Sequence, residues 1–252
     1  MLKTKHNRLF ALDIHKETVF AFILGLAAIV AGILVRFSDS ILMWSIIRDV
    51  LQISIIGIVL PFTIMAKNKS NFFSSGIRFD RPLKYLLISL ILGGLLAINF
   101  ITKASGEMST LFSNEKLILM LYIMIVNIFE VLFFAAFLRY YFEKALGIIP
   151  SVILSAAFYS LHHAGFQPEF VELFIIGIVF ISIFRIANHW LICFPMWWVG
   201  GVGDVLISSA DSVNVSNTAW WRGIIILIVI CTMFYLKYPF GKKEIEHPSM
   251  KT

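Results

Sequence analysis

The chain has few charged residues and very little cysteine. Of its 252 residues, 14% are Asp, Glu, Lys or Arg, whereas soluble domains average about 25%. The only two cysteines, Cys193 and Cys231, both lie in apolar stretches, which excludes a disulfide framework. A cleavable leader is also not expected, because the first apolar stretch extends from near Val19 past Ile33 without a small-residue cleavage site. An ordinary soluble domain and a disulfide-rich secreted domain are therefore both excluded.

Apolar residues dominate instead. They make up 59% of the chain, Phe alone contributes 24 residues, and the mean hydropathy is +0.88. Because a helix needs about 20 mostly apolar residues to cross a bilayer, the sequence predicts an all-α, polytopic membrane bundle in a single transmembrane domain, residues 1–252. The predicted helices, about eight in number, are 18–36, 41–66, 84–102, 117–139, 149–164, 170–186, 190–208 and 221–238. Arg48 and Asp49 predict that the first turns of the second helix are interfacial or broken.

The basic residues are distributed as topology signals. The net charge of +6 does not indicate nucleic-acid binding, because Lys and Arg are spread over the short segments between apolar stretches. They concentrate at both ends of the chain and between residues 66 and 84, whereas the opposite connections are poorer, with Arg36 in the first and Arg222 in the last. The polar stretch "SSADSVNVSNTAWWR" that contains Arg222 is predicted to be a loop. We therefore expect an integral plasma-membrane protein surrounded by lipid, with both termini in the cytoplasm.

Three ionisable residues are predicted to lie at similar depths. From the helical rise, Glu130 lies about 13 Å from Arg139 at the cytoplasmic end of its helix, and His162 and Asp204 lie about 20 Å inside theirs. Because charge at this depth is costly, it is a functional-site hypothesis by default. A carboxylate and an imidazole that share one water can make that water nucleophilic. The alternative is structural: Glu130 pairs with an intramembrane cation such as Arg48, and His162 donates to a backbone carbonyl.

The order and spacing of these residues resemble a known family. The stretch "EVLFFAAFLRYYFEKALGIIPSVILSAAFYSLHH", which begins at Glu130, is similar to the CPBP family of intramembrane proteases, which includes type II CAAX prenyl endopeptidases and bacteriocin-immunity (Abi) proteins. "FYSLH" matches the family's Phe-x-x-x-His motif at Phe158 and His162. "GGVGD" places Asp204 at the Asn/Asp position of its last motif. The resemblance covers roughly residues 80–210.

The resemblance implies water activation by Glu130 and His162, with Asp204 near the oxyanion. The chain departs from the family pattern at four positions, which are Val131 for the second Glu, Ala135 for the Arg, Ala136 for a common Gly and Gly200 for the last-motif His. An ionised aspartate only accepts hydrogen bonds, so Asp204 would need a proton to stabilise an oxyanion. The loss of one oxyanion donor typically costs about 10²- to 10³-fold in rate.

Neighbouring polar residues are assigned lesser roles. His163 lies about 100° round the helix from His162 and is expected to face elsewhere. His189 is expected at the cytoplasmic edge, and Arg139 could take over part of the missing arginine's structural role. Zinc requires three protein ligands, and Glu130 with His162 supplies only two, so a tightly held zinc ion is not expected. A divalent metal at Glu130 and His162 is the less favoured alternative, and no other cofactor is expected.

Three functions are consistent with this sequence. The first is an intramembrane endopeptidase that hydrolyses a peptide or membrane-protein substrate near the bilayer. The second is a catalytically impaired relative that binds a membrane partner as an immunity or regulatory protein. The third is a small transporter in which Glu130 and Asp204 relay protons, although no inverted repeat is visible.

Overall fold

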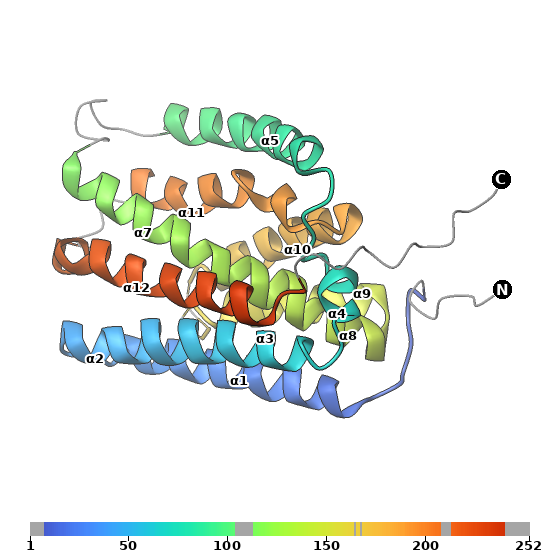
Figure 1. Ribbon diagram of the computed structural model, residues 1–252. Helices are drawn as coiled ribbons and strands as arrows, with labels where there is room; N and C mark the ends of the chain where they lie inside the picture. Colours follow the sequence, from blue (N-terminus) through green and yellow to red (C-terminus); the bar gives the residue numbers. More distant parts are fainter. Residues whose placement is uncertain (1–7, 104–112, 164, 167, 208–212, 240–252) are drawn as a thin grey trace.

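The computed structural model describes residues 8–103, 113–163, 165–166, 168–207 and 213–239, and this part of the chain forms helices and no strands (Figure 1). In chain order the helices are α1 (Lys16–Arg36), α2 (Ile41–Ser45), η2 (Ile46–Val59), α3 (Leu60–Met65), α4 (Ser70–Ser75), α5 (Pro82–Lys103), α7 (Asn114–Glu130), η3 (Val131–Leu138), α8 (Arg139–Leu146), α9 (Ile148–Leu161), α10 (Phe170–Ala187), η4 (Trp190–Cys193), α11 (Met196–Ile207) and α12 (Val213–Lys237). The first residue of α1 and the last of α12 lie at the same end of the bundle.

Six helical stretches of the described chain are long and apolar enough to cross a membrane. They are Lys16–Arg36, Ile41–Met65, Pro82–Lys103, Lys116–Leu146, Phe170–Ala187 and Thr218–Lys237. The all-α polytopic membrane bundle is thereby confirmed. Of the other two apolar segments, Ile148–Leu161 is shorter than the predicted 149–164, and the predicted 190–208 is divided into η4 and α11, the latter described to Ile207. At about 1.5 Å per residue, α9 is about 21 Å long, less than the roughly 30 Å hydrocarbon core.

Two of the long stretches contain π-helical segments. Ile41–Met65 runs through α2, η2 and α3 without a break, so a broken helix at Arg48 and Asp49 is wrong, whereas the alternative of interfacial first turns stays a prediction. The long stretch that ends at Leu146 likewise contains η3, which begins directly after Glu130. π-Helical turns are frequent at functional sites because they locally change which face a side chain occupies.

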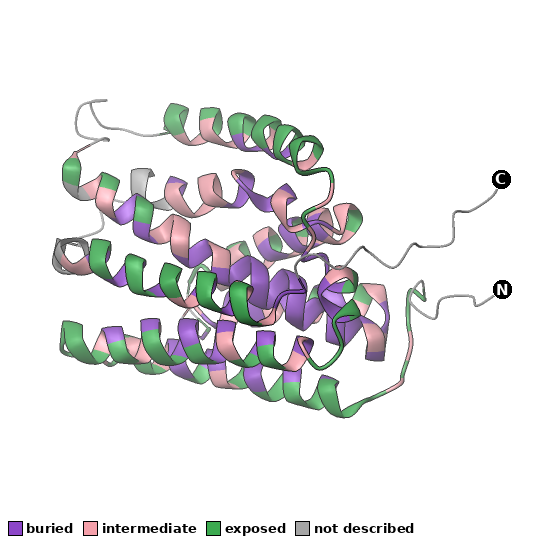
Figure 2. Cartoon of the chain, viewed as in Figure 1, coloured by how far each residue is buried: buried purple, intermediate pink, exposed green. Residues whose placement is uncertain are grey.

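The stretch made of α7, η3 and α8 is the central element of the bundle. Of the most apolar 18 consecutive residues in this stretch, 61% are buried. In α5, which lies at the edge of the bundle, the same fraction is 11%. Figure 2 shows this contrast, with the middle of the bundle buried and the outer faces of α1, α5 and α12 exposed. All eight residues of η3 are buried. Glu130 therefore lies at the centre of the innermost helix.

The connection before α12 is shorter than predicted. α12 begins at Val213, so the part of "SSADSVNVSNTAWWR" from Val213 onward is helical, and residues 208–212 lie outside the described chain. Arg222 is buried rather than in a loop, and its Nε donates to Asp49 Oδ2 at 2.6 Å. This ion pair neutralises Asp49 inside the bundle, which explains why the helix is not broken there.

Candidate functional site

Glu130 and two adjacent histidines form a buried cluster. Glu130 ends α7, and His162 and His163 follow α9. Glu130 Oε1 lies 3.8 Å from His162 Nε2 and 3.7 Å from His163 Nε2. Glu130 and His162 are buried, and His163 is half-buried. The structure thus brings together Glu130 and His162, and it adds His163.

The prediction that His163 faces away from this site is wrong. It assumed that the helix continues to residue 164, but α9 ends at Leu161 and the two histidines lie in the turn that follows. Their ring centroids are 3.9 Å apart. Gly165, with φ of 77°, and Pro168 follow directly and are strong turn residues. They are the feature from which the early helix end could have been predicted.

A single backbone carbonyl orients both imidazoles. The Nδ1 atoms of His162 and His163 both lie within hydrogen-bond reach of the Tyr159 carbonyl, the latter at 3.0 Å. Because a carbonyl only accepts, each Nδ1 carries a proton. In the neutral rings the Nε2 lone pairs are then free, and both face Glu130.

Trp197 on α11 holds the other oxygen of Glu130. Its Nε1 donates to Glu130 Oε2 at 3.0 Å, which leaves Oε1 for the histidines. Asn127, one turn before Glu130, donates to the Trp197 carbonyl at 3.2 Å and joins α7 to α11. Neither role was predicted from the sequence, because helix spacing does not determine how two helices are rotated against each other.

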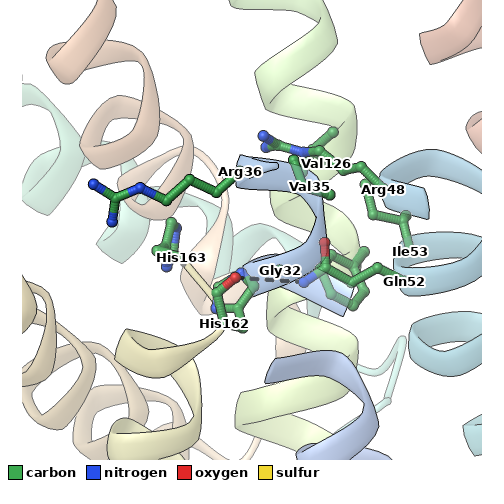
Figure 3. A pocket seen from close by; sticks show the side chains of 10 residues that line it. Gly32, Val35, Arg36, Arg48, Gln52, Ile53, Val126, His162 and His163 are labelled. Carbon is green, nitrogen blue, oxygen red and sulfur yellow. Dashed lines mark hydrogen bonds between the residues drawn. The ribbon is translucent and has the colours of Figure 1, made fainter. Parts of the chain in front are cut away.

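A pocket of about 400 Å³ adjoins the histidines (Figure 3). Its polar lining comes from both histidines and from the three residues Arg36, Arg48 and Gln52, and its apolar lining is Gly32, Val35, Ile53, Val126 and Phe129. Pockets of about 300 to 1,000 Å³ are typical of small-ligand sites. The site therefore has room for water and part of a substrate beside it.

Of the structural alternative, the contact of His162 with a backbone carbonyl, that of Tyr159, is confirmed, whereas the pairing of Glu130 with Arg48 is wrong. Arg48 lies over the ring of Trp44, 4.9 Å from its centroid, and makes no ion pair with Glu130. Arg139 does have a structural role, since it is buried, bonds Glu143 at 2.7 Å and donates to the Ser75 carbonyl at 2.9 Å.

Two further residues singled out in the sequence lie elsewhere. His189 is held by the Asp80 carbonyl at 2.8 Å and is not part of this cluster. The backbone of Asp204 is part of α11, but its side chain lies outside what the structure describes.

Removal of the Trp197 donor is expected to destabilise the protein. Trp197→Phe would leave a buried carboxylate oxygen without a partner, at a cost of about 1–3 kcal/mol of unfolding free energy. Unfolding in mixed micelles measures this loss. The matched control is Trp198→Phe, because the buried Trp198 Nε1 has no hydrogen-bond partner among the described residues. Equal losses for the two variants would contradict the role assigned to Trp197.

No protein-family model, curated protein or solved structure matches this chain.

Proposed function

We propose that the protein is an intramembrane hydrolase of the CPBP type, which cleaves a peptide bond near the bilayer with water activated by Glu130 and His162. One observation carries the proposal. Of the buried carboxylates in the described chain, Asp49 and Glu143 are paired with arginines, whereas Glu130 has no arginine or lysine partner and lies beside two histidines and the Trp197 N–H. Since an uncompensated carboxylate in a membrane interior is costly, its retention favours a chemical role over a structural one.

The geometry suits a shared water. A water placed between Glu130 Oε1 and His162 Nε2, which are 3.8 Å apart, can donate one hydrogen to each and keep a lone pair for attack. Its oxygen adds to the peptide carbonyl carbon while Glu130 takes the proton. Glu130 then returns that proton to the leaving amine as the C–N bond breaks. His163 is the second acceptor available to the same water.

The apolar part of the pocket lining suits the apolar side chains of a membrane peptide, and it lies beside the polar Arg36, Arg48 and Gln52. Phe129 and Val126 line the pocket together with Val35 and Ile53. The short α9 ends within the depth of a bilayer, where irregular backbone is tolerated only against protein or a water-filled cavity. A membrane-embedded segment could thus meet water at the histidines. We further propose that the protein lies in the plasma membrane with both termini in the cytoplasm.

The test is complementation of the phenotype caused by deletion. Glu130→Gln and His162→Ala are compared with wild type at matched membrane levels, and both are expected to abolish rescue, because loss of a general base typically costs about 10²- to 10⁴-fold in rate. The matched controls are the exposed residues Glu169 and His15, changed to Gln and Ala. Both controls should rescue fully.

The alternative is a protein that acts by binding alone. It is favoured by Gly200, which occupies the position of the family's last histidine and packs where an added Cβ would lie 3.1 Å from Phe180. Full rescue by both Glu130→Gln and His162→Ala would refute the hydrolase and support this alternative.

A further inference from the structure

We infer that Glu130 Oε1 and the Nε2 atoms of His162 and His163 form a binding site for one zinc-type divalent cation. The three ligand atoms all lie within 4.8 Å of one another. The expectation of no tightly held zinc rested on a count of two ligands. His163 supplies the third.

The separations fit ligands around a metal better than direct hydrogen bonds. The two Glu130–histidine distances, 3.7 and 3.8 Å, exceed the roughly 3.2 Å limit of good hydrogen bonds. Ligands at about 2.0–2.1 Å from a tetrahedral zinc ion are about 3.3–3.4 Å apart. The two Glu130–histidine pairs are within about 0.3–0.5 Å of that spacing, and the third pair, His162 with His163, lies within 4.8 Å.

The surrounding contacts orient the ligands as metal sites require. A metal-binding histidine usually donates its other ring N–H to a carbonyl or carboxylate, which fixes the tautomer. Here the Tyr159 carbonyl serves both rings. The Trp197 N–H holds Glu130 Oε2, which leaves Oε1 as a single oxygen ligand. These contacts leave Glu130 Oε1 and the two Nε2 atoms as the available ligand atoms, within 4.8 Å of one another.

The ligand types and the pocket identify the class of cation and of site. Two imidazoles with one carboxylate suit zinc and similar transition metals, whereas Mg²⁺ and Ca²⁺ prefer oxygen ligands. Catalytic zinc sites have three protein ligands and leave a position open for water or substrate. The pocket beside His162 and His163 provides that open side.

The other buried charged clusters of the described chain lack these properties. Asp49 is saturated by Arg222 and Tyr122, and Glu143 by Arg139 and Arg185. A cation there would meet guanidinium groups. Among the described residues, the Glu130 cluster is the group that brings three potential ligand atoms within 4.8 Å of one another.

The inference deepens the proposed function but does not depend on it, since binding is measured without a substrate. If a divalent cation occupied this cluster during hydrolysis, Glu130 would serve as one of its ligands and the cation would supply the positive charge that acidifies the water. The general-base role proposed above for Glu130 therefore applies to the metal-free site.

The experiment titrates Zn²⁺ into the full-length chain, purified in detergent and stripped with a chelator. Calorimetry and elemental analysis are expected to give one ion per chain. His163→Ala should weaken binding at least about ten-fold, because even the loss of a residue that only supports a ligand typically costs about 10- to 100-fold. The exposed His15→Ala is the control and should bind as wild type does. Failure of wild type to bind Zn²⁺, or unchanged affinity in His163→Ala, would overturn the inference.

A second measurement uses only the wild-type chain, so it tests the site even if the His163 variant misfolds. Co²⁺ bound to the wild-type chain should give the intense visible absorption of a tetrahedral site, and a weak octahedral spectrum would count against the proposed ligands. The two proposals also fail separately. Loss of rescue in Glu130→Gln without Zn²⁺ binding leaves a metal-free hydrolase, whereas Zn²⁺ binding with full rescue leaves a metal site without the proposed hydrolysis.

Discussion

Arg222→Met is expected to lower the free energy of unfolding by about 3–5 kcal/mol, a change of roughly 150- to 5,000-fold in the folding equilibrium. The Arg222 guanidinium bonds Asp49 Oδ2 at 2.6 Å and the Tyr122 hydroxyl at 3.1 Å. The same hydroxyl donates to Asp49 Oδ1 at 2.6 Å. Methionine fills a similar volume but leaves Asp49 as an unpaired buried charge, which is the costly outcome for an ion pair of this kind.

Equilibrium unfolding in mixed micelles measures this change. Arg36→Met is the control, because Arg36 is exposed and makes no ion pair among the described residues. The double variant Asp49→Leu with Arg222→Met removes both charges and should be more stable than Arg222→Met alone. A loss below about 1 kcal/mol for the single variant, the range of surface ion pairs, would show that the pair is not buried as described.

The Asp49–Arg222 pair also shows what the sequence could not predict. Hydrophobicity alone predicted the all-α membrane bundle, because long apolar stretches have few other structures available in lipid. It could not predict that Arg222 points inward, since a basic residue beside two tryptophans has the composition of an interfacial segment. The partner of Arg222 lies 173 residues away, on η2. Such a pairing depends on how the helices are packed.

The candidate site was predictable to a similar extent. The rise of a helix is fixed, so the depths of Glu130 and His162 could be compared from their positions in the sequence alone. The inward rotation of His163 depends on the end of α9 at Leu161, and the contact from Trp197 depends on the approach of α11 to α7. An added Cβ on Gly201 would lie 2.3 Å from the Asn127 amide, so a larger residue there would displace the side chain that bonds the Trp197 carbonyl. The helical period thus predicted the depth of the site residues, whereas their orientation depends on contacts between helices.

Gly32→Ala is expected to destabilise the protein by about 3 kcal/mol, at the upper end of the usual range for overpacking, and to abolish rescue. An added Cβ on Gly32 would lie 2.0 Å from the His162 carbonyl oxygen and 2.9 Å from its carbonyl carbon. These are backbone atoms, so no rotamer change relieves the contact. Either α1 moves away, which opens the pocket that Gly32 lines, or the turn that holds His162 and His163 shifts, which separates the histidines from Glu130.

The measurement combines unfolding, rescue and Zn²⁺ binding in the same variant. Gly94→Ala is the matched control, because Gly94 is also inside a helix and nothing lies within 4 Å of its added Cβ. Helix propensity alone makes that change neutral or stabilising by up to about 1 kcal/mol. If Gly32→Ala behaved like Gly94→Ala, the close contact between α1 and His162 would be refuted.

The contact between α1 and His162 also positions the wall of the pocket, since Gln52 bonds both the Ala28 and the His162 carbonyls, at 2.8 and 3.4 Å. Loss of Zn²⁺ binding in Gly32→Ala, with membrane insertion retained, would then show that α1 determines the histidine geometry without contributing a ligand.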